Sequence, residues 1–182
     1  MKENLIRLWF GAVRTAADAG ESALPEEMSL SPLQKTKLQI LLRQDLCDSL
    51  IQSIQNAEGI GSDRANQIYK TIYSELMEDA VSGVWNEEEK MDLACFLSKC
   101  SDGVANAEVF CACFRSILDA EDVGAQQELG AVLLQVKNSA DKSLNTFIKA
   151  RARQNAPKPT IERDSPPPGM DEFEYIDWLI SH

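Results

Sequence analysis

Few side chains in this sequence have the chemistry of a catalytic site. The only histidine is His182. Histidine is the usual general base, and it activates the serine and cysteine nucleophiles of hydrolases. His182 is the last residue of the sequence, and no other histidine is present. This argues against a hydrolase of familiar type. The 29 Asp and Glu side chains could still act in acid–base chemistry, but their spacing selects no pair. We predict that the chain is not an enzyme and has no catalytic residues, with carboxylate or lysine chemistry in a helical pocket as an alternative.

The five cysteines are Cys47, Cys95, Cys100, Cys111 and Cys113. Paired zinc ligands usually have two to four residues between them. On a helix, Cys95 and Cys100 would point about 140° apart, and Cys111 and Cys113 about 160° apart. We therefore interpret the cysteines as small side chains of the core. We predict no metal site and no cofactor, and the alternatives are a structural metal and redox sensing.

The first residues do not have the layout of a secretory leader. Arg7 interrupts the apolar run, and no small-residue cleavage site follows cleanly. An odd number of cysteines without a leader favours free thiols in a reducing compartment. No apolar run approaches the ~20 residues of a membrane-spanning helix. We expect a cytoplasmic protein without a membrane span.

The last residues combine acidic groups with large apolar side chains. Disordered chain ends usually carry few large apolar side chains. Here they follow two proline-rich stretches, at 157–159 and 165–169, that cannot continue a helix. As a helix, the segment would gather apolar side chains on one face, and as a strand it would alternate them; both patterns are used in peptide recognition. The six large apolar residues are Phe173, Tyr175, Ile176, Trp178, Leu179 and Ile180.

We predict that these six residues form a docking segment, because aromatic side chains are favoured as anchors in binding interfaces. Residues 173–176, an aromatic-x-x-aliphatic sequence flanked by acids, also resemble the short motifs that recruit autophagy-type ubiquitin-like modifiers. The segment has two alternative receptors. One is a groove in its own helical body, and the other is a separate protein or a second copy of the chain.

Net charge bears on the class of partner. The chain carries −11 at neutral pH, which argues against direct binding to nucleic acid or to an anionic membrane, since both require clustered cations. Residues 137–163 contain seven Lys and Arg against two acids, whereas residues 164–182 contain five acids and no Lys or Arg. The cations could simply complement the end of a helix, or they could pair with the acidic tail.

Apolar residues recur at helical spacing through most of the chain. A first helix is expected from about residue 3 to residue 18, packed against the rest of its own domain, with a membrane-surface anchor or a homodimer contact as the alternatives. A loop is expected at residues 20–31. Ser31 followed by Pro32 is a typical helix start. Beyond it the apolar positions fall every four residues, at Leu38, Leu42, Leu46, Leu50 and Ile54. With no Gly or Pro between residues 33 and 58, we expect one long helix through the core.

Later helix boundaries come from capping patterns. Ser62 is expected to cap the next helix, and Asn86 with Glu89 has the spacing of a capping box. A last helix is expected from near Asp122 to a point before Pro157. We find no alternating β-branched run long enough for a strand.

The sequence therefore predicts an all-α fold of about six antiparallel helices in one bundle-like domain. We expect the helical domain at residues 1–153, a Pro-rich linker at 154–169 and the acidic aromatic tail at 170–182. The predicted function is a non-enzymatic interaction module, an adaptor or regulatory protein that docks through its tail. An acidic inhibitor or immunity-type protein that masks a basic partner is the alternative.

Overall fold

The structure is a computed structural model of the 182-residue chain, and it describes residues 2–101, 107–118 and 126–156. All regular secondary structure within these ranges is α-helical, which confirms the all-α prediction. The helices are α1 (Lys2–Glu21), α2 (Pro32–Cys47), α3 (Leu50–Glu58), α4 (Ser62–Val81), α5 (Glu87–Ser101), α6 (Ala107–Ile117) and α7 (Gln126–Asn155). The linker and tail from residue 157 onward, and the predicted start of the last helix near Asp122, lie outside the described residues.

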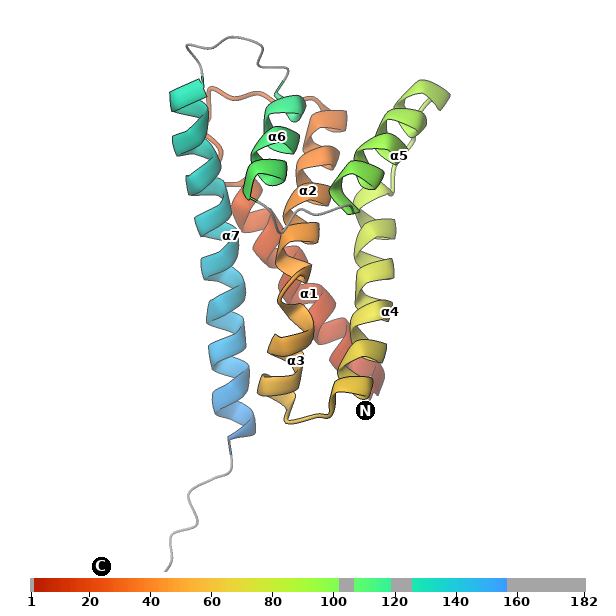
Figure 1. The fold of residues 1–182 in the computed structure, drawn as a ribbon, viewed down its shortest axis with the longest axis vertical. Helices are drawn as coiled ribbons and strands as arrows, with labels where there is room; N and C mark the ends of the chain where they lie inside the picture. Colours follow the sequence, from red (N-terminus) through yellow and green to blue (C-terminus); the bar gives the residue numbers. More distant parts are fainter. Residues whose placement is uncertain (1, 102–106, 119–125, 157–182) are drawn as a thin grey trace, which may run out of the picture.

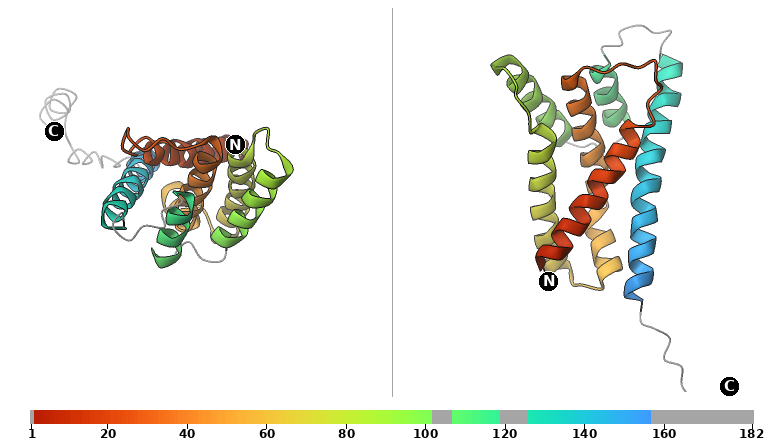
Figure 2. Two further views of the ribbon diagram at one scale, coloured as in Figure 1. Left: turned by 90° about the horizontal axis from the view of Figure 1, so that it is seen from above. Right: turned by 180° about the vertical axis from the view of Figure 1, so that it is seen from behind.

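The helices enclose a core that is centred on α2 and α3. Helix α7 lies along one side of this pair and α4 along the other (Figure 1). Helices α5 and α6 lie near the N-terminal end of α2 (Figure 1). Seen from behind, α1 crosses the molecule diagonally between α4 and α7 (Figure 2), and it contacts α2, α4 and α7. The predicted packing of the first helix against its own body is therefore confirmed.

The four-residue repeat of α2 and α3 supplies the centre of the core. All of its members are buried: Leu38, Leu42, Leu46, Leu50 and Ile54. Helix α7 also faces the core, with Leu129, Val136, Ala140 and Leu144 buried. The apolar pattern therefore identified the buried faces of these helices correctly.

The prediction of one helix across residues 33–58 is wrong at one point, because the helix breaks at Asp48 and Ser49. The Asp48 N–H donates to the Asp45 carbonyl at 3.2 Å, a tighter turn than an α-helix makes. Ser49 has φ −100° and ψ 4°, and both the N–H and the hydroxyl of Ser53 donate to its carbonyl. Short polar side chains favour such ends, because they compete with the helix for backbone hydrogen bonds. Helix α3 then contacts both α4 and α7.

Two of the three helix starts with a predicted capping residue have the expected capping. The Ser31 hydroxyl accepts from the Gln34 N–H, and the Gln34 side chain accepts from the Ser31 N–H. Asn86 and Glu89 make the same reciprocal pair at 2.9 Å in each direction. The third start is wrong, since Gly61 is the N-cap of α4 and Ser62 is its first helical residue, without a side-chain cap.

Helix α1 is longer than expected and includes Gly20, which the sequence placed in a loop. A Cβ at this position would lie 2.9 Å from Cδ1 of Leu42 and 3.1 Å from the carbonyl oxygen of Val136. The absence of a side chain at Gly20 therefore allows α1 to pack closely against α2 and α7. Gly20 does not end the helix.

Candidate functional site

A groove runs along α7, and we call it the α7 groove. It consists of two adjoining pockets that share Asp45 and Lys137. The apolar pocket has a volume of about 440 Å³ and is lined by Asp45, Ala107, Phe110, Cys111, Gly130, Leu133, Leu134 and Lys137. The acidic pocket has a volume of about 280 Å³ and is lined by Asp45, Leu46, Asp48, Ser49, Lys137, Asp141, Leu144, Asn145 and Ile148.

Helices α6 and α7 form the walls of the apolar pocket and leave its centre open. On α7, a Cβ added to Gly130 would meet no atom within 4 Å. Leu134 is 59% exposed although it is a large apolar residue. On α6, Ala107 and Cys111 lie one turn apart and reach the same pocket. The pocket is therefore an accessible apolar surface between two helices.

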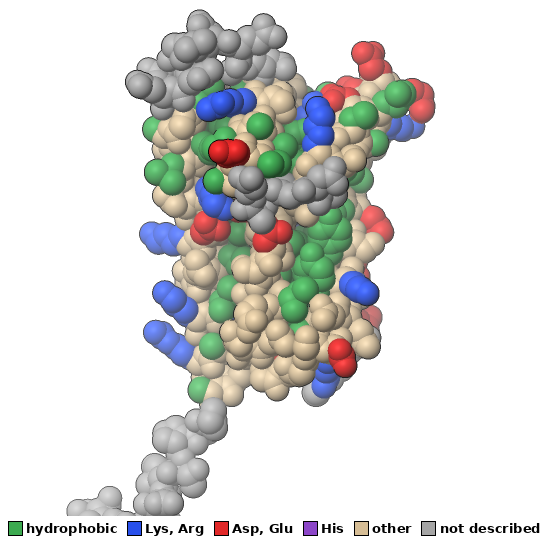
Figure 3. Space-filling model, in the orientation of Figure 1, with side chains coloured by type: hydrophobic (Ala, Val, Ile, Leu, Met, Phe, Trp, Pro, Cys, Tyr) green, Lys and Arg blue, Asp and Glu red, His purple; other side chains and the backbone are tan. Residues whose placement is uncertain are grey.

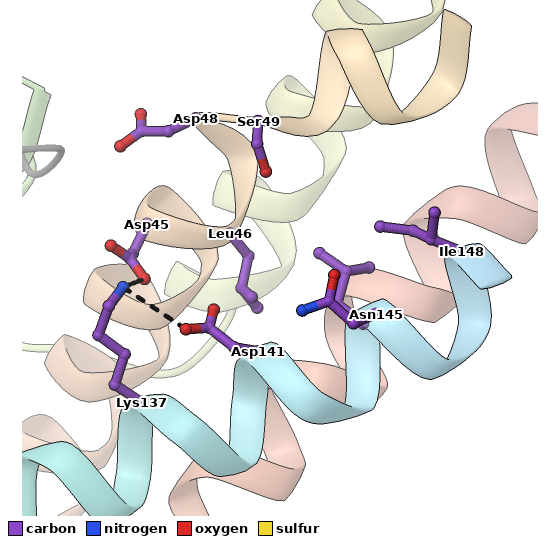
Figure 4. A pocket seen from close by; sticks show the side chains of 9 residues that line it. Asp45, Leu46, Asp48, Ser49, Lys137, Asp141, Asn145 and Ile148 are labelled. Carbon is purple, nitrogen blue, oxygen red and sulfur yellow. Dashed lines mark hydrogen bonds and ion pairs between the residues drawn. The ribbon is translucent and has the colours of Figure 1, made fainter. Parts of the chain in front are cut away.

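Lys137 joins the two pockets and is held by three groups. Its ammonium forms a short ion pair with Asp45 of α2 and a second pair with Asp141, one turn along α7, at 3.9 Å (Figure 4). It also lies 5.1 Å from the centre of the Phe110 ring. These contacts tie α7 to α2 and α6, and they occupy the lysine within the protein.

Two carboxyl groups of the acidic pocket have perturbed acidity. Burial raises the pKa of Asp45 above its ordinary value of 3.8, although the hydrogen bond and charge of Lys137 oppose the change. Burial also raises the pKa of Asp48, and the more distant charge of Lys137 opposes it. Asp48 is exposed at the break between α2 and α3, and no ion pair to it is present among the described residues. Its carboxylate is thus able to receive a cation from outside.

The arrangement is better suited to binding than to proton transfer. The α7 groove contains three carboxyl groups and one cation, and the cation is already engaged. Figure 3 shows acidic side chains beside a cation near the middle of this face, with hydrophobic surface around them. An apolar segment bearing a positive charge would match both the shape and the sign of charge of the groove.

A second polar cluster, around Glu58, lies at the other end of α7. Arg151 donates to both carboxylate oxygens of Glu58, at 2.7 and 2.9 Å, and Trp9 and Asn155 donate to the same carboxylate at 2.9 and 3.0 Å. Burial by itself would raise the pKa of Glu58, but these hydrogen bonds outweigh it and hold the pKa below its ordinary value. The cluster joins α1, α3 and α7, and we assign it a structural role.

The six residues predicted as the docking segment lie outside the described part of the chain, so the structure places none of them. All five cysteines are free. Cys47, Cys100 and Cys113 are buried as expected and Cys111 is partly buried, whereas Cys95 is exposed, so its assignment to the core is wrong. Within the described ranges, no group of three or more His, Cys, Asp or Glu side chains is placed to hold a metal ion.

Sequence reasoning did not find the α7 groove. Asp45 and Lys137 are 92 positions apart, and no local spacing indicates that they meet. One local signal was present, because Leu134 lies off the core stripe of its helix and had no predicted partner. Single exposed apolar residues are common on protein surfaces, so this signal alone could not have located the groove.

Comparison with protein-family models, curated proteins and solved structures finds no match to this chain. Among the described helices, none has both the length and the apolar character needed to cross a bilayer.

Proposed function

We propose that this chain is a non-enzymatic protein-interaction module, an adaptor or regulatory protein with two binding elements. One is the α7 groove, and the other is the acidic aromatic tail predicted at residues 170–182. The observation that supports a binding role is the open apolar pocket between α6 and α7, where Leu134 is 59% exposed. A contiguous apolar recess edged by charge is typical of peptide-binding surfaces. The free thiols are consistent with a cytoplasmic location, which is part of the proposal.

The occupant that we propose for the groove is a basic amphipathic helix of another protein. Along α7 the groove extends from Gly130 to Ile148, a distance of about 27 Å on a helix. A partner helix of about 18 residues would match that length. Its apolar face would cover Leu133 and Leu134, and a Lys or Arg on its edge would reach Asp48.

Charge argues against the chain's own tail as the occupant of the groove. The tail contributes five acids and no Lys or Arg, and the α7 groove already has three carboxyl groups for one lysine. Like charges at close range disfavour such a pairing. We therefore propose that the tail, with Trp178 and Phe173 as anchors, docks on a separate protein.

Binding to the groove can be measured with a fluorescent, 18-residue amphipathic peptide of Leu and Lys and the full-length chain. We expect Leu134→Asp or Asp48→Lys to weaken binding by about tenfold, equivalent to about 1.4 kcal/mol. Met91→Asp is the matched control, because Met91 is 70% exposed on α5 and does not line the groove. Equal affinities for all three variants would overturn the assignment.

Cysteine labelling gives an independent readout of the same binding event. Cys111 lines the apolar pocket, whereas Cys95 is exposed elsewhere, on α5. The bound peptide should slow the alkylation of Cys111 by iodoacetamide and leave that of Cys95 unchanged. A peptide in which the lysines are replaced by glutamates should protect neither thiol, whereas equal protection by both peptides would remove the role of charge.

The acidic side chains of the groove also favour a second candidate, an acidic inhibitor that masks a basic partner. The two candidates differ in the part of the chain that they require. Partner recovery that is lost in a chain ending at Arg163, and restored when residues 157–182 are fused to an unrelated protein, supports the adaptor. Recovery that survives both the truncation and Leu134→Asp, and that weakens with added salt, supports the inhibitor, because the groove of the adaptor depends on its apolar pocket as well as on charge.

A further inference from the structure

Another recess lies at the C-terminal end of α7, and we call it the α1–α4 pocket. The start of α1, the connection between α3 and α4, and the end of α7 all lie at this end of the molecule (Figure 1). Leu8 is 38% exposed here, so the pocket presents apolar surface to solvent. The pocket has a volume of about 400 Å³, and its lining includes Leu5, Leu8, Glu58, Ile60, Arg64 and Arg151.

The charge of the α1–α4 pocket is opposite in sign to that of the α7 groove. Among the described lining residues, two are arginines and Glu58 is the one carboxylate. Arg151 pairs with Glu58 and offsets its charge. Arg64 is exposed, and it forms no ion pair within the described ranges. An incoming carboxylate would therefore meet an unpaired cation beside apolar side chains.

We propose that the α1–α4 pocket receives the acidic aromatic tail of a second copy of this chain. The inference rests on the proposed docking role of the tail, and it names the separate protein on which the tail docks. Residues 164–182 contain five acids, no Lys or Arg, and the anchors Phe173 and Trp178. The pocket complements both features, because its lining combines apolar side chains with the guanidinium of Arg64.

The length of the spacer favours the pocket of a second copy over the chain's own pocket. Asn155, at the end of α7, donates to the Ala57 carbonyl at 2.8 Å and to the Glu58 carboxylate at 3.0 Å, so the chain leaves α7 beside the pocket. Residues 157–172 then precede Phe173, and five of them are proline. A proline-rich spacer extends by about 3.1 Å per residue, or about 50 Å over this stretch. A stiff spacer much longer than the distance it must cover gives a low effective concentration.

The same contact can form twice in one dimer. With two-fold symmetry, each copy gives its tail to the pocket of the other. Exchange between copies depends on concentration, so the tail stays unbound in a dilute solution of the chain. We therefore expect monomers in dilute solution and dimers in concentrated solution. Added salt should weaken the dimer, because the tail and the pocket have opposite charge.

Sedimentation of the full-length chain from micromolar to submillimolar concentration measures this association. Arg64→Glu and Leu8→Asp should each weaken dimerisation by about tenfold or more, equivalent to about 1.4 kcal/mol. Lys70→Glu is the control for charge, because Lys70 is exposed on the same helix as Arg64 and does not line the pocket. Leu134→Asp is the control for the apolar contact, because Leu134 belongs to the α7 groove. Equal association of all four variants, or a parent chain that stays monomeric, would overturn the proposal.

A mixing experiment separates exchange between copies from docking within one chain. The chain ending at Arg163 keeps its pocket and has no tail, whereas the full-length Arg64→Glu chain keeps its tail and has an altered pocket. Neither should dimerise alone, but their mixture should form a heterodimer. A tail that occupies its own pocket would instead keep the parent chain monomeric, and a peptide of residues 164–182 would then bind the truncated chain and not the full-length one. That result would overturn the second copy as the occupant.

The fluorescent peptide of residues 164–182 also separates this inference from the proposed function. It should bind the folded truncated chain, as judged by circular dichroism, and should bind the same chain carrying Arg64→Glu about tenfold more weakly. A peptide that binds neither form, while the tail still recovers another protein, would overturn the inference and leave the adaptor proposal standing. A tail that binds neither its own chain nor any other protein would overturn both.

Discussion

At the scale of single residues, burial separates the leucines that hold the fold from those available for binding. Leu46 is 3% exposed and lies in the core stripe of α2, whereas Leu134 is 59% exposed on α7. Removing a buried leucine side chain costs its transfer free energy and leaves a cavity. Replacing Leu46 should therefore lower the stability of the fold, whereas replacing Leu134 should weaken binding and leave stability almost unchanged.

We predict that Leu46→Ala lowers the free energy of unfolding by about 2–5 kcal/mol. Leu134→Ala should change it by no more than about 0.5 kcal/mol, as is usual at exposed positions. Urea unfolding followed by circular dichroism measures both. A cost near zero for Leu46→Ala would show that the core is wrongly placed.

Glu58 predicts a pH dependence. Its pKa is lowered in the folded protein from the ordinary value of 4.5. A depressed carboxyl pKa contributes stability that is present above the unfolded-state pKa and lost as pH falls through the folded-state pKa. Glu58→Gln should thus destabilise the protein by about 1–3 kcal/mol at neutral pH, because it removes charge-assisted hydrogen bonds from Arg151 and Trp9.

The stability difference between the parent chain and Glu58→Gln should narrow as the pH falls below 4.5. The comparison must be made as a difference, because the raised pKa values of Asp45 and Asp48 act in the opposite direction. Glu3→Gln is a suitable control, since its ion pair with Arg7 is exposed. A difference in unfolding free energy between the parent chain and Glu58→Gln that stays constant with pH would show that the ionisation of Glu58 does not contribute to stability.

At the scale of elements, the sequence predicted helix positions and buried faces well, because apolar spacing and side-chain caps are local features. The α2–α3 break was missed because Asp48 and Ser49 are tolerated inside helices, and only the packing of α3 shows that the helix bends there. Gly20 was misassigned for a related reason, since glycine permits both a turn and a close helix contact. The α7 groove depends on pairs that are distant in sequence, such as Asp45 with Lys137, and these could not be predicted.

The two glycines of α1 make a matched test of this view. Gly20→Ala should destabilise by about 1–3 kcal/mol, because its Cβ would overlap Leu42 and Ala140. Gly11→Ala should stabilise by about 0.5–1 kcal/mol, because a Cβ there meets nothing within 4 Å and alanine favours the helix. Thermal unfolding of the two variants measures both signs, and stabilisation by both would contradict the close packing of α1 on α2 and α7.

At the scale of the whole molecule, charge is unevenly distributed. Lys142, Lys149 and Arg153 are exposed on α7, and cations line the outer edge of this helix in Figure 3. Within the described ranges, none of these three side chains forms an ion pair. Residues 164–182 contribute five acids. For the tail to dock on a separate protein, its attraction to this cationic edge must be too weak to hold it on its own body.

The chain truncated after Arg163 should therefore unfold at the same urea midpoint as the full-length chain, at low and at high salt, because the core residues of the described ranges lie between Trp9 and Leu144. A tail held on the cationic edge would instead stabilise the body at low salt, where attraction between exposed charges is least screened. Truncation would then lower the midpoint at low salt only, and Lys142→Glu with Lys149→Glu in the full-length chain would reproduce the loss. Equal midpoints, together with a Trp178 whose fluorescence is that of a water-exposed indole, would leave the tail available to a partner.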